Sequence, residues 1–479
     1  MARVVGGINL PFGYSQESTK TYQRFKTIYS ELVANEPARK RQLRHFSDAY
    51  QRVRADYVYA LNDDELINSV ITISIIALVP SNVSKIRSQR YLKDRTLMKT
   101  PVTEMFKIEF PILAFSHCRD VVAAVCKAGG MGVLGAVGHS DEDLEIDLAW
   151  IRDEIGDLPF GVDLIVPARY AGDDGGGLTM ADVAALIPGE HRDFLNDLLT
   201  RYEVPQDEEA DGQGPAWSSL GNSADAPFSA NRAGEQLEIA LSHGPALMAN
   251  ALGPPPPEMI EQCHEVGVKV AALAGSRAHA ERNVNAGADL IIAQGAEAGG
   301  HTGEIGTMVL IPDVVDAISP VPVLGAGGIG GGRQMAAAMA LGAAGVWCGS
   351  VWLTTEEAET HPVVKQKMLE ANTHDTLRSR SLTGKPARML RTAWTDEWDR
   401  EDTPDPLGMP LQSILTGGTQ QRINRSAHRS GSGAEKLATY FVGQIVGSMN
   451  RSRPAAQVVL EMVQEFIDAT ESLGNQLDV

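Results

Sequence analysis

The sequence predicts an α/β protein whose main domain is a (β/α)8 barrel, also called a TIM barrel. Between Phe110 and Leu353, short apolar runs alternate with helical segments, which is the pattern of parallel strands joined by helices. Two glycine-rich loops follow strands late in this series, where such barrels commonly bind phosphate. A doubly wound open sheet is the alternative fold, and the late position of both loops favours the barrel.

Eight short apolar runs are the predicted barrel strands. Strands that are buried on both faces read as such runs and carry little polar alternation. They comprise residues 111–115, 132–134, 160–165, 246–249, 269–273, 290–293, 323–324 and 346–348.

Helices are predicted between these strands. Gly129-Gly130 suits the end of the first helix, and Pro257 suits the first position of another. The predicted helices comprise residues 120–128, 142–155, 258–266, 277–286, 308–318 and 333–341.

Residues 1–98 differ from the rest of the chain because they hold 15 Lys or Arg against 9 Asp or Glu and lack the strand–helix alternation. We expect a basic, poorly ordered extension; a tail that binds an acidic partner and a true start at Met98 are the alternatives. Its apolar run, residues 67–79, is too short and too polar to span a bilayer. Nothing at Met1 resembles a signal peptide, so we expect a cytoplasmic protein without membrane contact.

Two further segments interrupt or follow the barrel, which is predicted to span residues 99–353. Residues 167–233 are rich in glycine and acidic groups and form an insertion after the third strand, either a lid or a disordered segment. Residues 182–202 within it keep helical periodicity. Residues 354–479 are predicted to be a helical region packed on the barrel, with helices at 362–371, 434–447 and 455–473 and a flexible joint at 430–433.

Composition excludes some classes of function. The hydrophobic content of 43% is that of a globular protein, and the net charge of -19 argues against a nucleic-acid partner. The four cysteines form no C-x-x-C pair and no zinc spacing, so we expect reduced thiols and no metal site. The sequence leaves self-association into a homo-oligomer open.

The first chemically suggestive loop follows the strand at 290–293. The stretch from Ile291 to Gly303 contains four glycines and one histidine. Gly299 and Gly300 have no side chain, so a ligand could lie against the backbone there. His301 is the one side chain of this loop that titrates near neutral pH. A glycine-rich turn with an incidental surface histidine is the alternative interpretation.

The second glycine-rich region comprises residues 321–332 and 345–350. Two successive strand ends with glycines and a hydroxyl suit a phosphate held by backbone N–H groups and a helix N-terminus. Gly325, Gly327 and Gly330 also satisfy G-x-G-x-x-G, the dinucleotide-binding fingerprint. That fingerprint requires an acidic residue about 20 positions further on, where this chain has Ser350. We therefore reject a Rossmann unit.

These residues resemble the FMN-dependent nitronate monooxygenases, formerly called 2-nitropropane dioxygenases. The stretch from Gln294 to Gly303, Q-G-A-E-A-G-G-H-T-G, is similar to their central motif. Residues 325–329 and 348–350 are similar to their phosphate-loop segments, and residues 111–114 and 128–132 to their opening strand and helix.

The resemblance implies an FMN site and a catalytic histidine. His301 would face the substrate near the flavin, either orienting the nitro oxygens as a cation or removing the α-proton as a neutral base. The implied flavin contacts are Ala114, Asp163, Gln294, Gly299 and Gly300, and the implied phosphate contacts are Gly327, Gly328, Gly349 and Ser350.

Four residues depart from the family pattern around the substrate face. Residues 114–116 are Ala-Phe-Ser where the family has Ala-Pro-Met, and Ser350 replaces threonine. Asp163 stands where the family has asparagine, and an ionised carboxylate only accepts hydrogen bonds, so its flavin contact would change unless it is protonated. Cys118 lies at the first strand end, and we expect a buried, inert thiol there rather than a reactive one.

The implied activity is oxidation of alkyl nitronates by O2 to a carbonyl compound and nitrite. The partners expected are therefore a small-molecule substrate and O2. One alternative is an FMN- and NAD(P)H-dependent enoyl-thioester reductase, whose Gly-Gly-His motif is very similar. The other is a barrel that binds a phosphorylated ligand without redox chemistry.

Overall fold

The computed structural model describes residues 4–5, 8–9, 98–166, 184–205, 230–251, 253–429 and 431–476. The chain divides into two compact units, Met1–Arg95 and Thr96–Val479. In the first unit only strands β1 (Val4–Val5) and β2 (Ile8–Asn9) are described, and they pair antiparallel. The predicted basic extension and most of the predicted insertion fall on residues outside those that the structure describes, so these two predictions are not tested.

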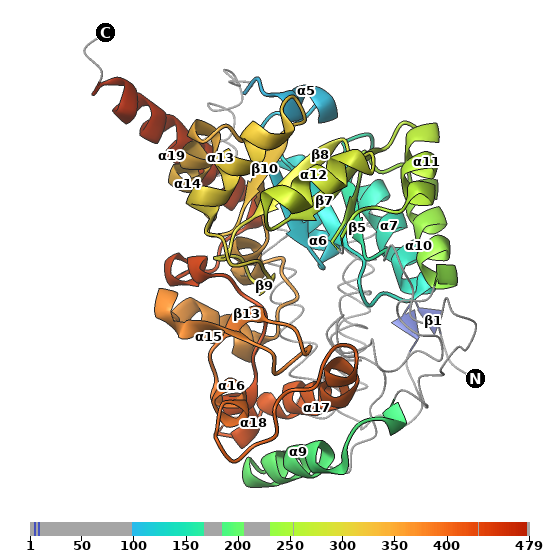
Figure 1. The fold of residues 1–479 in the computed structure, drawn as a ribbon, viewed down its shortest axis with the longest axis vertical. Helices are drawn as coiled ribbons and strands as arrows, with labels where there is room; N and C mark the ends of the chain where they lie inside the picture. The colour runs from blue at the N-terminus through green and yellow to red at the C-terminus, as the bar shows by residue number, and fades with distance from the viewer. Residues whose placement is uncertain are drawn as a thin grey trace. The chain divides into compact units, whose positions relative to one another are not determined.

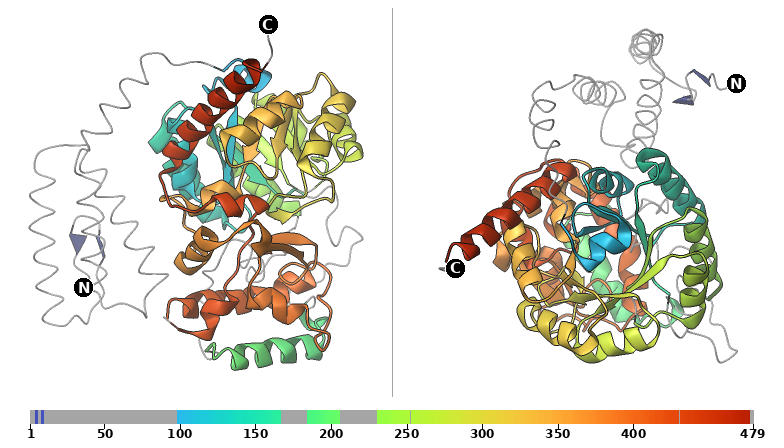
Figure 2. Two further views of the ribbon diagram at one scale, coloured as in Figure 1. Left: turned by 90° about the vertical axis from the view of Figure 1, so that its left-hand side faces the viewer. Right: turned by 90° about the horizontal axis from the view of Figure 1, so that it is seen from above.

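Eight parallel strands close into a barrel in the second unit, which confirms the predicted fold (Figure 2, right). Each predicted strand is present within one or two residues at either end. In chain order they are β3 (Ile112–Ser116), β4 (Met131–Gly135), β5 (Gly161–Leu164), β6 (Leu247–Asn250), β7 (Lys269–Ala274), β8 (Leu290–Gln294), β10 (Val323–Ala326) and β11 (Gly345–Cys348).

Helices surround the barrel, and the six predicted between the strands are confirmed to within one residue. Their ends follow local chemistry: the Ser140 side chain accepts a hydrogen bond from the Asp143 N–H at the start of α7. The helices are α6 (Arg119–Lys127), α7 (Asp141–Ile155), α11 (Pro257–Glu265), α12 (Arg277–Asn285), α13 (Thr307–Ile318) and α14 (Gly332–Ala340).

Two more helices complete the ring, and the sequence did not assign them to the barrel. Helix α10 (Ala230–Ser242) packs against α7 and β5, although its first residues fall within the predicted insertion. Helix α19 (Ala455–Gly474) packs between α14 and α6, which is the place of the helix that follows β11 (Figure 1). The chain therefore leaves the barrel after β11 and returns to it through α19.

The barrel interior is apolar and closed at the N-terminal end of its strands. Leu113, Met131 and Ile292 are fully buried inside it, and Val102 and Phe106 of helix α5 (Pro101–Phe106) pack against this core. Such packing holds the strands rigidly, so that residues at their opposite ends keep a fixed arrangement.

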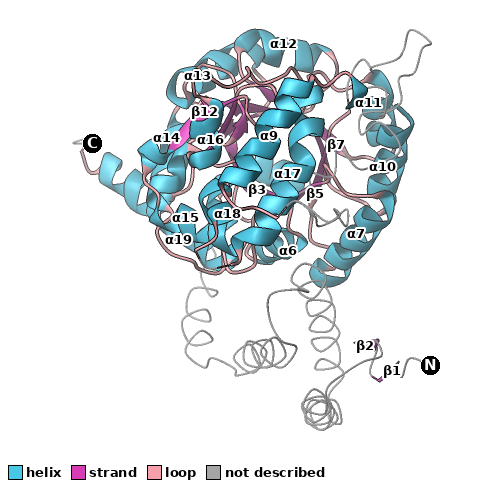
Figure 3. Ribbon diagram, turned by 90° about the horizontal axis from the view of Figure 1, so that it is seen from below, coloured by secondary structure: helices cyan, strands magenta, loops and turns pink. Residues whose placement is uncertain are grey.

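Residues 184–205 and 355–454 form a second layer with its own apolar core, which we call the cap region (Figures 1 and 3). Leu195, Leu198 and Leu199 of the first segment pack with Trp394 and Trp398 of the second. Its helices are α9 (Gly189–Arg201), α15 (Pro362–Glu370), α16 (Ala393–Trp398), α17 (Leu411–Ala427) and α18 (Gly433–Leu437), with 3-10 turns η2 (Ser350–Thr354), η3 (Thr373–Asp375) and η4 (Gln444–Ser448) leading into or through it.

A three-stranded sheet joins the cap region to the barrel. Strands β12 (Thr376–Ser379) and β13 (Ala387–Leu390) form an antiparallel hairpin, and β13 also pairs with β9 (Gly300–His301) from the loop after β8. This sheet fixes the position of the histidine loop.

The predicted single helix at residues 434–447 is wrong. Helix α18 ends at Leu437, and the next residues are extended because they pair with the end of β13. The Leu390 N–H donates to the Tyr440 carbonyl, and the Thr439 hydroxyl donates to the Leu390 carbonyl. β-branched and aromatic residues at 439–442 suit this extended segment.

No helix in the described part of the chain is long and apolar enough to cross a membrane.

Candidate active site

The structure brings the ten site residues predicted from sequence to one end of the barrel. Strands β8, β10, β11 and β3 are neighbours, with Gln294 beside Ala326 and Cys348 beside Ala114. Because all eight strands are parallel, their carboxyl ends share one rim. Ala114 and Asp163 lie on β3 and β5, Gln294 ends β8, Gly299, Gly300 and His301 follow β8, Gly327 and Gly328 follow β10, and Gly349 and Ser350 follow β11.

The glycines after β10 and β11 offer unused hydrogen-bond donors. Within the described residues, the backbone N–H groups of Gly327, Gly328 and Gly349 donate to no other group. Gly327 and Gly328 have φ of 94° and 67°, the left-handed region that favours glycine. Three neighbouring free N–H groups form a suitable binding site for an anion such as phosphate.

The cap region contributes a residue to this place that the sequence analysis missed. The Gly443 N–H donates to the Ser350 hydroxyl oxygen at 2.8 Å, and the Gln444 N–H donates to the Glu297 carbonyl at 2.9 Å. Because Ser350 accepts this bond, its own O–H proton stays available to a ligand.

Gly299 and Gly300 have different surroundings. A side chain on Gly299 would lie 2.8 Å from the backbone of Val442, so the missing side chain makes room for the cap region. A side chain on Gly300 would meet nothing within 4 Å, and its φ is 76°. Of these two glycines, Gly300 therefore has open space where a side chain would lie, and Gly299 does not.

Asp163 is a buried carboxyl group with an unpaired oxygen. Its side chain is 3% exposed, and its Oδ1 has no hydrogen-bond partner in the described structure. Burial raises the pKa of Asp163 to about 7. A half-neutral carboxyl at the barrel rim can donate or accept a hydrogen bond, which suits a polar ligand atom.

The raised pKa of Asp163 predicts that the apoprotein loses stability as pH rises. The folded state keeps the proton up to about pH 7, whereas the unfolded chain releases it near pH 4. The contribution of Asp163 to the free energy of unfolding is therefore fully present below pH 4 and is lost as pH rises through 7. In the wild type this group should change the free energy of unfolding by an amount on the order of 4 kcal/mol between pH 4 and 7, and Asp163→Asn should abolish that pH dependence. Denaturant unfolding from pH 4 to 8 measures it, with exposed Asp193→Asn as control; parallel curves for wild type and Asp163→Asn would contradict it.

His301 is held at the edge of the small sheet and remains neutral at physiological pH. It pairs with Ala387 through the backbone, and its Nε2 lies 2.8 Å from the Thr383 hydroxyl oxygen. The residue as a whole is exposed, but burial of its imidazole, followed by the charge of Lys385, lowers the pKa of His301 to about 4. Of the two roles considered from sequence, a neutral base or hydrogen-bond partner fits this pKa, and a cation does not.

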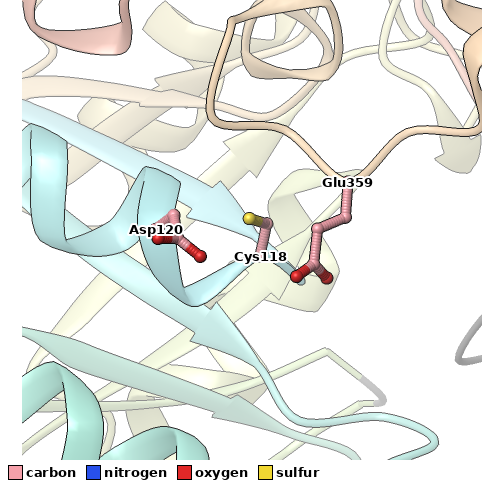
Figure 4. A group of neighbouring side chains, drawn as sticks. All are labelled: Cys118, Asp120 and Glu359. Carbon is pink, nitrogen blue, oxygen red and sulfur yellow. The ribbon is translucent and has the colours of Figure 1, made fainter. Parts of the chain in front are cut away.

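Cys118 lies near the same rim but is not a reactive thiol. It is 5% exposed and its Sγ donates to the Glu357 carbonyl at 3.0 Å. Burial, followed by the charges of Glu359 and Asp120, raises its pKa far above the usual range. The Cys118 sulfur and a carboxylate oxygen of each of Asp120 and Glu359 lie within 4.8 Å of one another (Figure 4). A protonated, hydrogen-bonded thiol agrees with the inert role predicted for it.

The fold and this rim define a class of protein: a (β/α)8 barrel whose candidate site lies at the carboxyl ends of the strands. The model of the nitronate monooxygenase family matches residues 99–465. The chain therefore belongs to the nitronate monooxygenase family, a family of flavin-dependent enzymes.

Relatives and solved structures are similar to this chain over most of its length. A Mycobacterium tuberculosis protein described as a monooxygenase is 59% identical over 78% of this chain and 98% of its own length. A Staphylococcus saprophyticus protein described as a nitronate monooxygenase is 30% identical over 68% of this chain and 87% of its own. The structure of nitroalkane oxidase from Streptomyces ansochromogenes is similar, with a TM-score of 0.62, 26% identity, and coverage of 78% of this chain and 99% of that one. FabK from Thermotoga maritima matches with a TM-score of 0.56 and 26% identity over 79% of this chain and 100% of that one.

Proposed function

We propose that this protein binds FMN and oxidises alkyl nitronates with O2, giving a carbonyl compound and nitrite. The observation that carries the proposal is the set of free N–H groups after β10 and β11, on the same rim as His301. Membership in the nitronate monooxygenase family and the similarity to a nitroalkane oxidase support the substrate class.

The residues at the rim fit an FMN cofactor. The N–H groups of Gly327, Gly328 and Gly349 and the Ser350 hydroxyl would hold its phosphate, since they are unused donors. Ala114, Gln294, Gly299 and Gly300 would border the ring, and the unpaired Oδ1 of Asp163 would hydrogen-bond a polar atom of it. When bound, FMN supplies the electron acceptor for oxidation of the substrate.

His301 supplies the acid–base chemistry of the chain itself. Its neutral imidazole can accept the α-proton of a nitroalkane, or donate a hydrogen bond to a nitro oxygen of the nitronate. The positive charge of Lys385 acts on His301, and an anionic nitronate placed beside this ring would be attracted by the same charge.

The cofactor is expected to be FMN and not FAD, because the loops offer one phosphate site and no adenosine-binding unit. Heat release of the flavin from purified protein, followed by chromatography, identifies it. FAD, or no flavin after FMN is added to the apoprotein, would contradict the proposal. The second outcome would favour a barrel that binds a phosphorylated ligand without redox chemistry.

The same purified protein can be assayed for the alternative activity, the reduction of enoyl thioesters. The enoyl reductase domain of MlnA from Bacillus amyloliquefaciens shares the fold at 13% identity, so the fold alone does not separate the two activities. Rapid NADH or NADPH oxidation with an enoyl thioester, and none of the proposed nitrite release, would favour the reductase.

A further inference from the structure

We infer that Thr383 is a positioning residue that holds neutral His301 with its proton on Nε2, so that Nδ1 is the nitrogen available to the substrate. The hydrogen bond joins residues that are 82 positions apart, so no local pattern in the sequence predicts this contact. The role assigned to Nδ1 rests on the proposed function, whereas the tautomer itself does not.

The contacts of the Thr383 hydroxyl determine the direction of each hydrogen bond. Its Oγ1 lies 2.8 Å from His301 Nε2, 3.2 Å from the Lys385 carbonyl and 3.5 Å from the Lys385 N–H. A hydroxyl donates one hydrogen bond and accepts two. A carbonyl can only accept, so the hydroxyl proton goes to the Lys385 carbonyl, and both nitrogens donate to Oγ1. All three contacts are then satisfied, which requires the proton of neutral His301 on Nε2.

The opposite arrangement satisfies fewer groups. If Thr383 donated to His301 Nε2, the Lys385 carbonyl would lose this hydroxyl as its donor, and the ring proton would move to Nδ1, which makes no hydrogen bond within the described residues. The Nε2–H form is the one that keeps all three contacts of the Thr383 hydroxyl.

Thr383 is held in place by the turn between β12 and β13. The Gly384 N–H donates to the Arg380 carbonyl at 2.8 Å, and the Thr416 hydroxyl of α17 donates to the Leu382 carbonyl at 2.8 Å. Gly384 has φ of 82°, and a side chain there would lie 2.3 Å from the Leu407 carbonyl oxygen. The hydroxyl therefore has a fixed position relative to the β9 strand that carries His301.

The tautomer leaves one nitrogen free for chemistry. Within the described residues, His301 Nδ1 makes no hydrogen bond. If a nitroalkane is bound there, its α-C–H bond breaks, the electron pair moves into the nitro group to give the nitronate, and the proton bonds to Nδ1. The imidazolium that results keeps its Nε2–H bond to Thr383, so the ring does not have to turn during the transfer.

Nitrogen NMR of protein labelled with 15N in its histidine rings tests the tautomer without any substrate. The His301 signals are assigned by their loss in His301→Asn, and spectra are recorded near pH 7, where the ring is neutral. We expect a protonated Nε2 and an unprotonated Nδ1 in the wild type and in Thr383→Ser, and a mixture of tautomers in Thr383→Val. A proton on Nδ1 in the wild type, or an unchanged tautomer in Thr383→Val, would overturn the inference.

Kinetics test the positioning role separately. Thr383→Val should lower kcat/KM for a nitroalkane by roughly 10–100-fold, the usual effect of losing a partner that orients a histidine. Activity on the preformed nitronate and flavin content should change less, and Thr383→Ser should restore the nitroalkane rate. Equal losses on both substrates would reveal a structural role only. An inactive wild type with the expected tautomer would refute the proposed function and leave the tautomer assignment intact.

Discussion

Replacing His301 with alanine is expected to lower kcat/KM for neutral nitroalkanes by roughly 10²–10⁴-fold, the usual contribution of a positioned acid or base. Flavin binding should remain, because the phosphate donors lie after β10 and β11 and not on β9. Activity on the preformed nitronate should fall less, since no α-proton has to be removed from it.

Steady-state kinetics on a nitroalkane and its nitronate, with flavin content measured in parallel, test this prediction. His279→Ala is the matched control, because His279 is exposed on α12 and lies outside the site. Unchanged rates on both substrates would remove His301 from the mechanism. Loss of flavin would instead make it a structural residue of the loop.

The pH dependence of the nitroalkane reaction follows from the same group. The pKa of His301 is lowered to about 4 by the protein around it and by Lys385, so the imidazole is neutral and able to accept a proton throughout the neutral range. Protonation removes this ability, so kcat/KM should fall as pH drops through about 4 and show no loss from His301 near pH 6.5. A pH profile of wild type, compared with that of His301→Ala, measures this acidic limb.

The second large effect is expected from Gly443→Ala. A side chain at this position would lie 2.6 Å from the Glu297 carbonyl oxygen and 3.0 Å from the Gly299 nitrogen, and neither backbone atom can move freely. The segment would have to shift, which would break the 2.8 Å bond to Ser350. We expect a loss of stability of about 1–3 kcal/mol, as for overpacked interior sites, and flavin affinity lowered at least about tenfold.

Fluorescence titration of the apoprotein with FMN, together with thermal unfolding, measures both consequences. Gly418→Ala is a suitable control, because a side chain at this position of α17 would meet nothing within 4 Å. Wild-type flavin affinity in Gly443→Ala would show that the cap region does not support the phosphate loops.

The barrel could be predicted from sequence because its strands are short apolar runs with clear ends. Segments such as Leu290–Gln294 are buried on both faces and end in glycine loops. A few consecutive residues are therefore enough to identify the strand and the end of it that leads into the candidate site. The glycine loops after β10 and β11 were found for the same reason.

The cap region could not be predicted in the same way, since its contacts join distant parts of the chain. Thr383 contacts His301, which lies 82 positions before it in the sequence. Gly443 contacts Ser350, which lies 93 positions before it. One local signal was present: residues 380–386, which connect the two four-residue strands, include Gly384 and Pro386, and both residue types are typical of turns. Helix α17 gave little signal, because its buried face carries polar residues such as Gln412 and Thr416.

Helix α19 shows a different limit of sequence interpretation. Its apolar periodicity predicted a helix at 455–473, and the structure has it at Ala455–Gly474. Only its packing against α14 and α6 identifies it as the last helix of the barrel ring. Periodicity reveals that a helix has an apolar face, but not which surface covers that face.

Nitrite release and oxygen uptake by FMN-loaded protein, measured with an alkyl nitronate and without any nicotinamide nucleotide, test the central claim most directly. We expect nitrite and a carbonyl compound in equal amounts, with oxygen consumed and with no activity in the flavin-free protein. The absence of nitrite from flavin-loaded protein, over a range of nitronate chain lengths, would contradict the account.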